Sequence, residues 1–404
     1  MLPNDPVAAL TPEVIVWRHA IHAQPELGFQ EHHTAAFVAQ HLRSFGIAVH
    51  EGIAGTGVVG VLRKGISART IGLRAELDAL PIVEKADVPY ASRSPGVMHA
   101  CGHDGHTAML LGAAKLLSQH ADFDGTVHFI FQPAEENEGG SQRMIDAGLF
   151  DRFPVDAVYA VHNWPGLPLG EIHTRVGPMM AAVDMFELRF TGTGAHAAMP
   201  HLGDDPLLAA AEFAGSVQRV VSRSVDPQTP LVVSLTQIHG GNVGNIVPGE
   251  VWVQGTCRFL ESGLSTHLET RINAIAQGIA TAHGVIARLD YRIGYPPVIN
   301  TEAAVARAVD AAAATIGRDK VVTDFKPSLG CEDFAYMIRA GSGAYVWVGT
   351  GPAGPGEGLH GDRYVFNDEI VPTVLRYWLN LVAQSLPPDS LPPRGGLGRE
   401  VDQG

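Results

Sequence analysis

The stretch HACGHDGH, residues 99–106, contains one thiol, three imidazoles and one carboxylate within eight residues. Gly102 and Gly105 allow the backbone to turn tightly enough for the neighbouring side chains to converge. Thiolate, imidazole and carboxylate groups are the usual protein ligands of first-row divalent metals. A Cys-x-His pair alone is more often a polar loop with ordinary hydrogen bonds. The stretch therefore predicts half of a metal site, provided that further ligands occur along the chain.

The segments around this stretch alternate between strands and helices. Apolar runs at 57–62, 70–76, 126–131 and 156–161 predict strands, and the nearly continuous apolar segment after His106 predicts a helix that is buried on most sides. Such alternation predicts an α/β fold with a mostly parallel sheet that is covered by helices. In folds of this kind, ligands bind beyond the carboxyl ends of the strands.

Three further candidate ligands follow predicted strands, so they are expected at the same edge of the sheet. A site for two divalent ions needs a bridging anion and one or two terminal ligands for each ion, and a thiolate can serve as the bridge. The candidate ligands are Cys101, His103, Glu136, His162 and His360.

Glu135 directly precedes the candidate ligand Glu136 in a turn that follows a predicted strand. Adjacent carboxylates on a turn can point in different directions, one to a metal and the other to a reacting water. We therefore expect Glu135 to be the general base. We expect His99, His106 and Asp104 to orient the ligands, although ordinary hydrogen bonding within the loop explains these three equally well.

Residues 183–295 differ from the rest of the chain. Their expected order is strand, helix, strand, strand, helix, strand, which is typical of a split ferredoxin-like unit. After residue 295, the alternation of strands and helices expected for the first part of the chain resumes. We therefore expect a discontinuous catalytic domain at 1–182 and 296–388, an inserted α+β ferredoxin-like domain at 183–295, and a disordered tail at 389–404, whose apolar content is low.

Composition limits the classes of partner. The chain has 404 residues, 46% of them apolar, which is enough to fill two domains. Its formal net charge is −14 and its basic residues form no cluster, which argues against a nucleic-acid partner. No segment approaches the ~20 apolar residues of a membrane span, and the first residues do not resemble a signal peptide. We therefore expect a cytoplasmic protein with no membrane partner, and the three widely spaced cysteines argue against a disulfide framework.

Several longer segments resemble a family of metal-dependent amidohydrolases. The family includes hippurate hydrolase, bacterial aminoacylases and plant auxin-conjugate hydrolases, and it is related to aminoacylase and carboxypeptidase G within one large metallopeptidase family. The resemblance covers residues 18–370 in a consistent order. The matching segments are HAQPELGFQE, LRAELDALPI, MHACGHDGHTAMLLGAA, FQPAEENEGG, GAHAAMPHLGDDP, GNIVPGEVWVQGTCR, CEDFAYM and LHGDRYVFND.

The resemblance implies a hydrolase that cleaves the amide bond of N-acyl amino acids, either hippurate-like or N-acetylated. It implies two divalent ions per subunit, for which manganese, zinc, cobalt and nickel all suit the ligand types. It implies the five ligands named above, with Glu135 as general base. It adds His196 as a lid histidine that stabilises the oxyanion, and Asn245 and Arg258 as groups that hold the substrate carboxylate. In dimeric relatives the lid histidine comes from the partner subunit, so we expect a homodimer or higher homo-oligomer formed through the inserted domain.

Two residues depart from the pattern of the family. Glu76 stands where aspartate is usual, and Cys331 replaces a small residue before Glu332. Both concern the surroundings of the site rather than its ligands.

Two kinds of alternative function remain open. A dipeptidase, a carboxypeptidase-like enzyme or an N-carbamoyl amino acid hydrolase would use the same metals, and a non-catalytic binding protein would retain only the fold. Cys101 favours the amidohydrolases, because the peptidase branches resemble one another in using aspartate as the bridge. The intact ligand set together with Glu135 argues against the binding protein.

Overall fold

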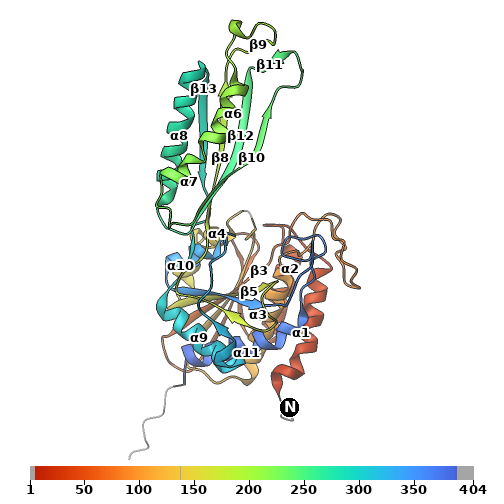
Figure 1. Ribbon diagram of the computed structural model, residues 1–404. Coiled ribbons are helices and arrows are strands. Elements are labelled where there is room, and N and C mark those ends of the chain that lie inside the picture. The colour runs from red at the N-terminus through yellow and green to blue at the C-terminus, as the bar shows by residue number, and fades with distance from the viewer. Residues whose placement is uncertain (1–4, 137, 389–404) are drawn as a thin grey trace, which may run out of the picture.

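The computed structural model describes residues 5–136 and 138–388, and the tail expected to be disordered, 389–404, lies outside them. Figure 1 shows two bodies, one above the other, joined where the chain passes between two sheets. The lower body contains an eight-stranded sheet and the upper body a four-stranded sheet.

The large sheet is mixed. Its strands, in chain order, are β1 (Ala48–Ile53), β2 (Gly57–Lys64), β3 (Thr70–Glu76), β4 (Gly125–Gln132), β5 (Ala157–Trp164), β6 (Ile172–His173), β15 (Val321–Val322) and β16 (Gly343–Gly349). In the sheet they lie in the order β1-β2-β4-β3-β5-β16-β6-β15. The neighbouring strands β4, β3, β5 and β16 run parallel, as do β6 and β15.

Three neighbouring pairs of this sheet, β1–β2, β2–β4 and β16–β6, are antiparallel. The α/β class is therefore confirmed, but the sheet expected to be mostly parallel is a mixed one, in which four of the seven neighbouring pairs are parallel. The connection between β1 and β2, residues 54–56, explains part of the difference. A link this short allows a hairpin, whereas parallel strands need a crossover of a dozen or more residues.

Helices cover both faces of the large sheet and bury its central strands. One face is covered by α1 (Pro6–His22), α2 (His32–Ser44), α3 (His103–His120), α9 (Glu302–Ile316) and α11 (Val371–Ser385), and the other by α4 (Gly140–Asp146), α5 (Leu149–Arg152) and α10 (Phe334–Ala340). Every residue of β4 and β16 is buried. Such fully buried strands are typical of parallel strands between two helical layers.

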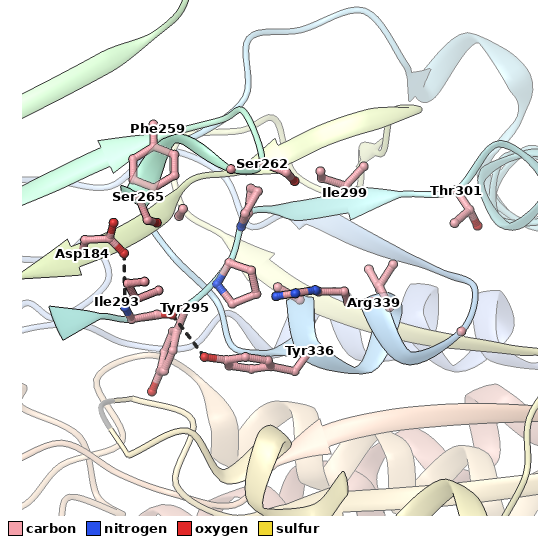
Figure 2. A pocket seen from close by; sticks show the side chains of 18 residues that line it. Asp184, Phe259, Ser262, Ser265, Ile293, Tyr295, Ile299, Thr301, Tyr336 and Arg339 are labelled. Carbon is pink, nitrogen blue, oxygen red and sulfur yellow. Dashed lines mark hydrogen bonds between the residues drawn. The ribbon is translucent and has the colours of Figure 1, made fainter. Parts of the chain in front are cut away.

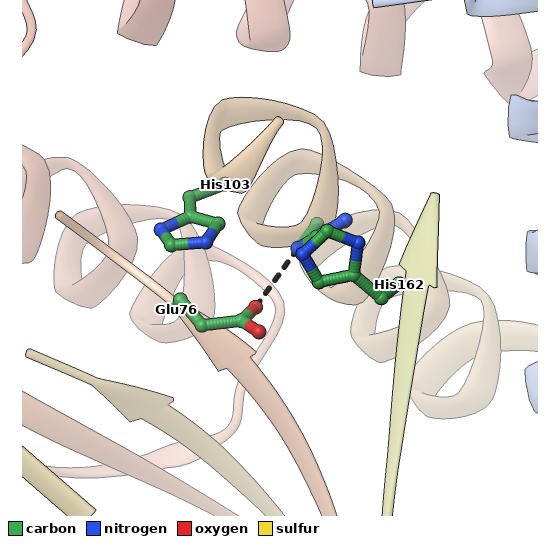
Figure 3. Close-up of side chains that lie close together, drawn as sticks. Glu76, His103 and His162 are labelled. Atoms are coloured by element: carbon green, nitrogen blue, oxygen red, sulfur yellow. Dashed lines mark hydrogen bonds and ion pairs between the residues drawn. The ribbon is translucent and has the colours of Figure 1, made fainter. Parts of the chain in front are cut away.

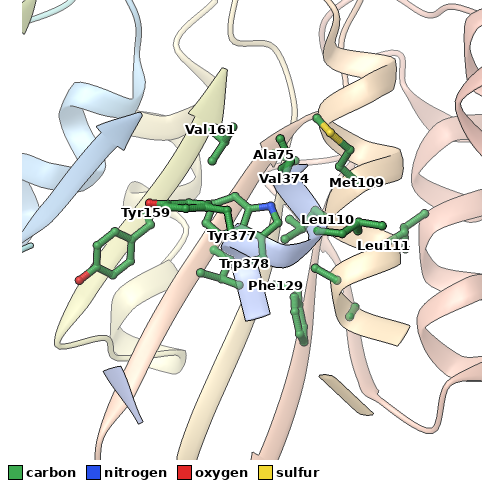
Figure 4. Close-up of a cluster of buried hydrophobic side chains, with 14 of the residues drawn as sticks. Ala75, Met109, Leu110, Leu111, Phe129, Tyr159, Val161, Val374, Tyr377 and Trp378 are labelled. Atoms are coloured by element: carbon green, nitrogen blue, oxygen red, sulfur yellow. The ribbon is translucent and has the colours of Figure 1, made fainter. Parts of the chain in front are cut away.

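Helix α3 lies within the larger core and supports the loop that precedes it. Fourteen of its eighteen residues are buried, as its apolar pattern predicts. Figure 4 shows Met109, Leu110 and Leu111 of α3 close to side chains of α11 and of the sheet. A Cβ atom at Gly105 would lie 2.2 Å from the ring of Phe366, so only glycine allows this contact. The tight packing fixes the N-terminal end of the helix, where the candidate ligands lie.

The upper body has one covered face. Its sheet consists of β8 (Ala182–Thr191), β10 (Leu231–Gly240), β12 (Glu250–Phe259) and β13 (Ile286–Ile293), all antiparallel and in the order β10-β12-β8-β13. Helices α6 (Pro206–Ser216), α7 (Arg219–Arg223) and α8 (Leu264–His283) pack on one side of it. Alternate residues of β8 are buried, as expected for a sheet with a single core face.

The remaining elements are short. They are β7 (Gly177–Met180), β9 (Ala195–His196), β11 (Ile246–Val247), β14 (Val298–Asn300) and the 3₁₀ turns η1 (Pro200–Leu202), η2 (Arg318–Lys320) and η3 (Asp368–Ile370). Among the described residues, no helix combines the length and the apolar character that crossing a membrane requires.

Candidate metal centre

The five predicted ligands lie at one edge of the large sheet. Glu136 follows β4, His162 lies near the end of β5, and His360 is in the loop after β16. These strands are parallel, so their carboxyl ends meet at the same edge. Cys101 and His103 reach that edge from the start of α3.

Each predicted ligand lies within 4 Å of another one. Cys101 Sγ is 3.5 Å from His162 Nε2. Glu136 Oε1 is 3.3 Å from His360 Nε2 and 3.9 Å from His103 Nε2. Cys101, Glu136 and His360 also offer donor atoms that all lie within 4.8 Å of one another. The structure therefore brings the five residues together in one cluster.

The free donor atoms of this cluster fit a metal. His103 Nδ1 donates to the backbone oxygen of Asp78 at 2.9 Å, and His162 Nδ1 donates to the backbone oxygen of Asn163 at 2.7 Å. Each ring therefore directs Nε2 into the cluster. His103 Nε2 and Glu136 Oε1 are buried and form no hydrogen bond with any described residue. Buried polar atoms rarely remain unpaired, so a divalent cation suits their position.

Asp78 positions two of these ligands, a role that the sequence did not reveal. Its Oδ1 lies 3.2 Å from His103 Nδ1, and its Oδ2 accepts a hydrogen bond from the backbone N–H of Glu136 at 3.0 Å. The available signal was its position two residues after β3, at the same edge of the sheet as the ligands.

His106 forms hydrogen bonds with two residues next to the cluster. Its Nδ1 donates to Glu76 Oε2 at 2.9 Å, and its Nε2 lies 2.7 Å from Asn163 Oδ1. Figure 3 shows Glu76 with His103 on one side and His162 on the other. Because both nitrogens of His106 are engaged, the ring can orient its neighbours but has no free atom for a metal.

Asp104 bonds to α1, and neither ring nitrogen of His99 forms a hydrogen bond with a described residue. Asp104 Oδ2 accepts hydrogen bonds from Arg18 Nη1 at 3.1 Å and from His22 Nδ1 at 2.8 Å, which ties α1 to the first turn of α3. Although burial opposes it, the charges of His22 and Arg18 hold the pKa of Asp104 well below its usual value. Burial lowers the pKa of His99 to about 4, so this ring is neutral.

Glu135 lies beside the cluster in an unusual electrostatic environment. Its side chain is buried, and its Oε1 accepts a hydrogen bond from the backbone N–H of Asp333 at 3.3 Å. Burial, together with the charges of Glu332 and Glu136, raises the pKa of Glu135 well above its usual value. A carboxylate that is costly to keep charged is a strong proton acceptor, which is the property required of a general base.

Arg74 balances the acidic groups around Glu135. Its guanidinium group is fully buried and lies 2.7 Å from Gln132 Oε1, 2.9 Å from Glu332 Oε1 and 3.0 Å from Asp333 Oδ1. It also forms an ion pair with Glu76. Buried carboxylates are tolerated when a cation pairs with them in this way.

A pocket of about 480 Å³ opens at the cluster. Cys101, Glu135, Glu136, His162 and His360 line it, and Arg258 enters it from β12 of the upper body. Its apolar walls include Leu80, Trp164, Met180 and Leu359. Cys331 lines the same pocket beside Arg258; burial raises the pKa of this thiol, whereas the Arg258 charge opposes the shift.

His196 and Asn245 do not line this pocket. They lie on the β9–β11 pair, where Ile246 pairs with His196 and the backbone oxygen of Asn245 accepts from Ala197 N–H at 3.0 Å. Figure 1 places this pair at the end of the upper sheet that points away from the large sheet. His196 is exposed there. Within one chain, the structure therefore brings Arg258 to the cluster but not His196 or Asn245.

Comparisons with known proteins point to one family. The family described as Peptidase family M20/M25/M40 matches residues 72–384. Hippurate hydrolase of Campylobacter jejuni is 38% identical over 372 residues, which cover 91% of this chain and 95% of that protein. An N-acyl-L-amino acid amidohydrolase of Geobacillus stearothermophilus is 46% identical over 290 residues, which cover 71% of this chain and 78% of that protein.

A solved structure agrees with this match. It is a dinuclear metal-binding peptidase of the M20 family from Bacillus subtilis, which superimposes with a TM-score of 0.81 at 32% identity and covers 94% of this chain and 99% of that one. The cluster of thiol, imidazole and carboxylate groups is thus in accord with a centre for divalent metal.

Zinc or manganese added to metal-free protein at pH 7 should release protons. Burial, together with Glu136 and Glu135, raises the pKa of the Cys101 thiol, and although burial opposes it, Asp78 and Glu76 raise the pKa of His103 to about 10. Both groups must lose a proton before they bind a metal, so the affinity should increase as the pH rises. Titration calorimetry in buffers of different ionisation enthalpy measures the protons released.

Cys101→Ser and Cys257→Ser provide the comparison, since Cys257 is a buried thiol in the core of the upper body. The first variant should release fewer protons than the unmodified protein, and the second should release the same number. Equal proton release by the two variants would contradict a ligand role for Cys101.

Proposed function

Because this chain belongs to peptidase family M20/M25/M40, we propose that the pocket of about 480 Å³ is its active site. The protein is a metal-dependent amidohydrolase that cleaves the amide bond of N-acyl amino acids to an amino acid and a carboxylic acid. The observation that carries the assignment of the site is the meeting of the five predicted ligands and Glu135 at one edge of the sheet.

The proposed centre would hold two divalent ions, with the Cys101 thiolate among their ligands. Zinc, manganese, cobalt and nickel are all compatible with its mixture of thiolate, imidazole and carboxylate groups. His103 and Glu136 supply the buried atoms that lack a hydrogen bond, which supports their assignment as ligands. His162 and His360 complete the set, each within 4 Å of another ligand.

The proposed chemistry divides the work between the metal and the side chains. When bound by these residues, divalent metal would polarise the amide carbonyl and lower the pKa of a water. Glu135 then accepts the proton of the attacking water and passes it to the departing amine nitrogen. Its burial suits the first step, because the neutral carboxylic acid that forms is favoured there.

The upper body supplies the groups that bind the substrate in this proposal. Arg258 already lines the pocket and carries the positive charge that a substrate carboxylate needs. His196 donates a hydrogen bond to the developing oxyanion, and Asn245 assists Arg258. Because the β9–β11 pair lies at the far end of its own sheet, we assign His196 and Asn245 to the active site of a second copy.

We therefore propose a homodimer formed through residues 183–295, which would act as a lid and dimerisation domain inserted into the catalytic domain at 1–182 and 296–388. Within the described residues, β10 and β13 are the outer strands of the four-stranded sheet, so their edges are available for contact between subunits. A reducing compartment such as the cytoplasm suits an active site that contains the free thiols of Cys101 and Cys331.

Glu135→Gln should retain metal and lower kcat by about 10²- to 10⁴-fold, the usual contribution of a general base. The assay is hydrolysis of hippurate and of N-acetyl amino acids, with dipeptides and N-carbamoyl amino acids as the alternatives. Glu138→Gln is the matched control because it changes an exposed carboxylate of the same turn. A near-normal rate for Glu135→Gln would remove Glu135 from the role of base.

Arg258→Met should raise KM by about 10- to 100-fold, as expected when a hydrogen bond to a charged group is lost. The increase should disappear with a substrate whose carboxylate has been converted to an amide. Arg288→Met, an exposed arginine on β13, should leave KM unchanged. If KM increases equally for the substrate and for its amide, Arg258 does not bind the substrate carboxylate.

Mixing the variants Glu135→Gln and His196→Ala should restore activity that neither has alone. In a mixed dimer, one site contains an intact Glu135 and receives an intact His196 from the other subunit. If His196 served its own subunit, every site would remain defective. The same experiment with Asn245→Ala tests whether Asn245 also acts across the dimer.

A further inference from the structure

The chain passes between the two bodies at a pair of short segments that are joined by backbone hydrogen bonds. Val183 N–H donates to the backbone oxygen of Tyr295 at 3.0 Å, and Gly294 N–H donates to the backbone oxygen of Val183 at 3.0 Å. Asp184 Oδ2 accepts from Tyr291 at 2.8 Å, and its Oδ1 accepts from Gly294 N–H at 3.2 Å. These two segments, 183–184 and 294–295, form an ordered element that we call the crossing.

A cavity of about 540 Å³ lies beside this crossing. Figure 2 shows Tyr295 and Tyr336 among the side chains that line it. Tyr336 donates from its hydroxyl group to the backbone oxygen of Gly294 at 3.2 Å. The rings of Tyr295 and Tyr336 meet edge to face, with centroids 6.0 Å apart. Tyr295 also lines the pocket at the metal cluster, so one ring separates the two spaces.

The hydroxyl group of Tyr295 joins the crossing to the turn that carries Glu135. It donates to the backbone oxygen of Glu135 at 2.8 Å and accepts from the backbone N–H of Gly139 at 3.0 Å. One oxygen atom thus links both ends of this turn. Gly139 has a φ of 67° and stands at the start of α4, so the backbone changes direction sharply there.

We propose that Tyr295 is a positioning residue for the general base. By linking Glu135 to Gly139, its hydroxyl group holds the turn in the shape that directs the Glu135 carboxylate to the reacting water. This role rests on the proposed function, in which Glu135 is the base. It also makes turnover depend on the segment that joins the two bodies, because Tyr295 belongs to that segment.

The contacts on the other side of the turn explain why this bond matters. The Asp78 carboxylate accepts a hydrogen bond from the backbone N–H of Glu136. The backbone N–H of Asp333 donates to the Glu135 carboxylate. Both of these contacts come from the lower body. The hydroxyl group of Tyr295 adds a contact from the crossing, and its loss would leave the Glu135 oxygen and the Gly139 N–H without this partner. A displacement of the base by about 1 Å is enough to lower a rate substantially.

Tyr295→Phe tests the proposal because it removes only the hydroxyl group. We expect kcat to fall by about 10- to 100-fold at saturating metal, with KM and bound metal unchanged. In metal-free protein, hydrogen exchange of the Gly139 amide should become about fivefold faster, as expected for the loss of one hydrogen bond. The exchange measurement does not depend on activity.

Tyr291→Phe is the matched control. It removes a hydroxyl group from the neighbouring strand β13, where the partner is Asp184 rather than the turn. It should leave kcat and the exchange of Gly139 unchanged. The proposal is overturned if Tyr295→Phe behaves like this control, if excess metal restores its rate, or if KM rises as much as kcat falls.

A double variant shows whether Tyr295 acts through Glu135. When Glu135→Gln is already present, adding Tyr295→Phe should cause little further loss, because the base that the hydroxyl group positions has been removed. A full additional loss would overturn the proposal. Inactivity of the unmodified protein on every acyl amino acid would instead reject the proposed function, whereas activity that Tyr295→Phe leaves intact would reject only the role of Tyr295.

Discussion

The buried Arg74 guanidinium group is the interaction on which the site depends. It lies in β3, at the centre of the large sheet, and contacts three carboxylates and one amide. On one side, the backbone N–H of Asp333 donates to the Glu135 carboxylate. On the other side, His106 bonds to both Glu76 and Asn163. Without this cation, so many acidic groups could not be buried together, because each would carry the full cost of its desolvation. Arg74 therefore supports the ligands and the base at the same time.

The residues that could be predicted from the sequence are those whose position follows from the nearest strand. Glu136 and His162 stand at strand ends, so an α/β pattern was enough to place them at one edge, and the glycines of 99–106 indicated a tight loop. Asp78 stands at the same edge, but its role depends on which atoms it faces. The antiparallel pairing of β1 with β2, of β2 with β4 and of β16 with β6 was missed because pairing across a sheet depends on contacts between distant segments.

The upper body contributes to the site unequally along its length. Arg258, near the end of β12, reaches the pocket, whereas His196 on the β9–β11 pair lies at the opposite end of the sheet. Local sequence cannot distinguish these situations, because it does not show which end of the sheet each residue reaches. The distinction follows from the direction and the ten-residue length of β12, which only the folded chain shows.

The position of β16 affects the order in which the protein can fold during synthesis. This strand lies between β5 and β6, yet it follows both in the chain and emerges only after the whole upper body has been made. At the usual rate of translation, the interval is on the order of tens of seconds. During that time the edge of β5, an almost entirely buried apolar strand, has no partner from β16. A nascent chain with such an open edge is prone to pair with other chains, so efficient folding of this protein in the cell should depend on chaperones that shield β5 until β16 arrives.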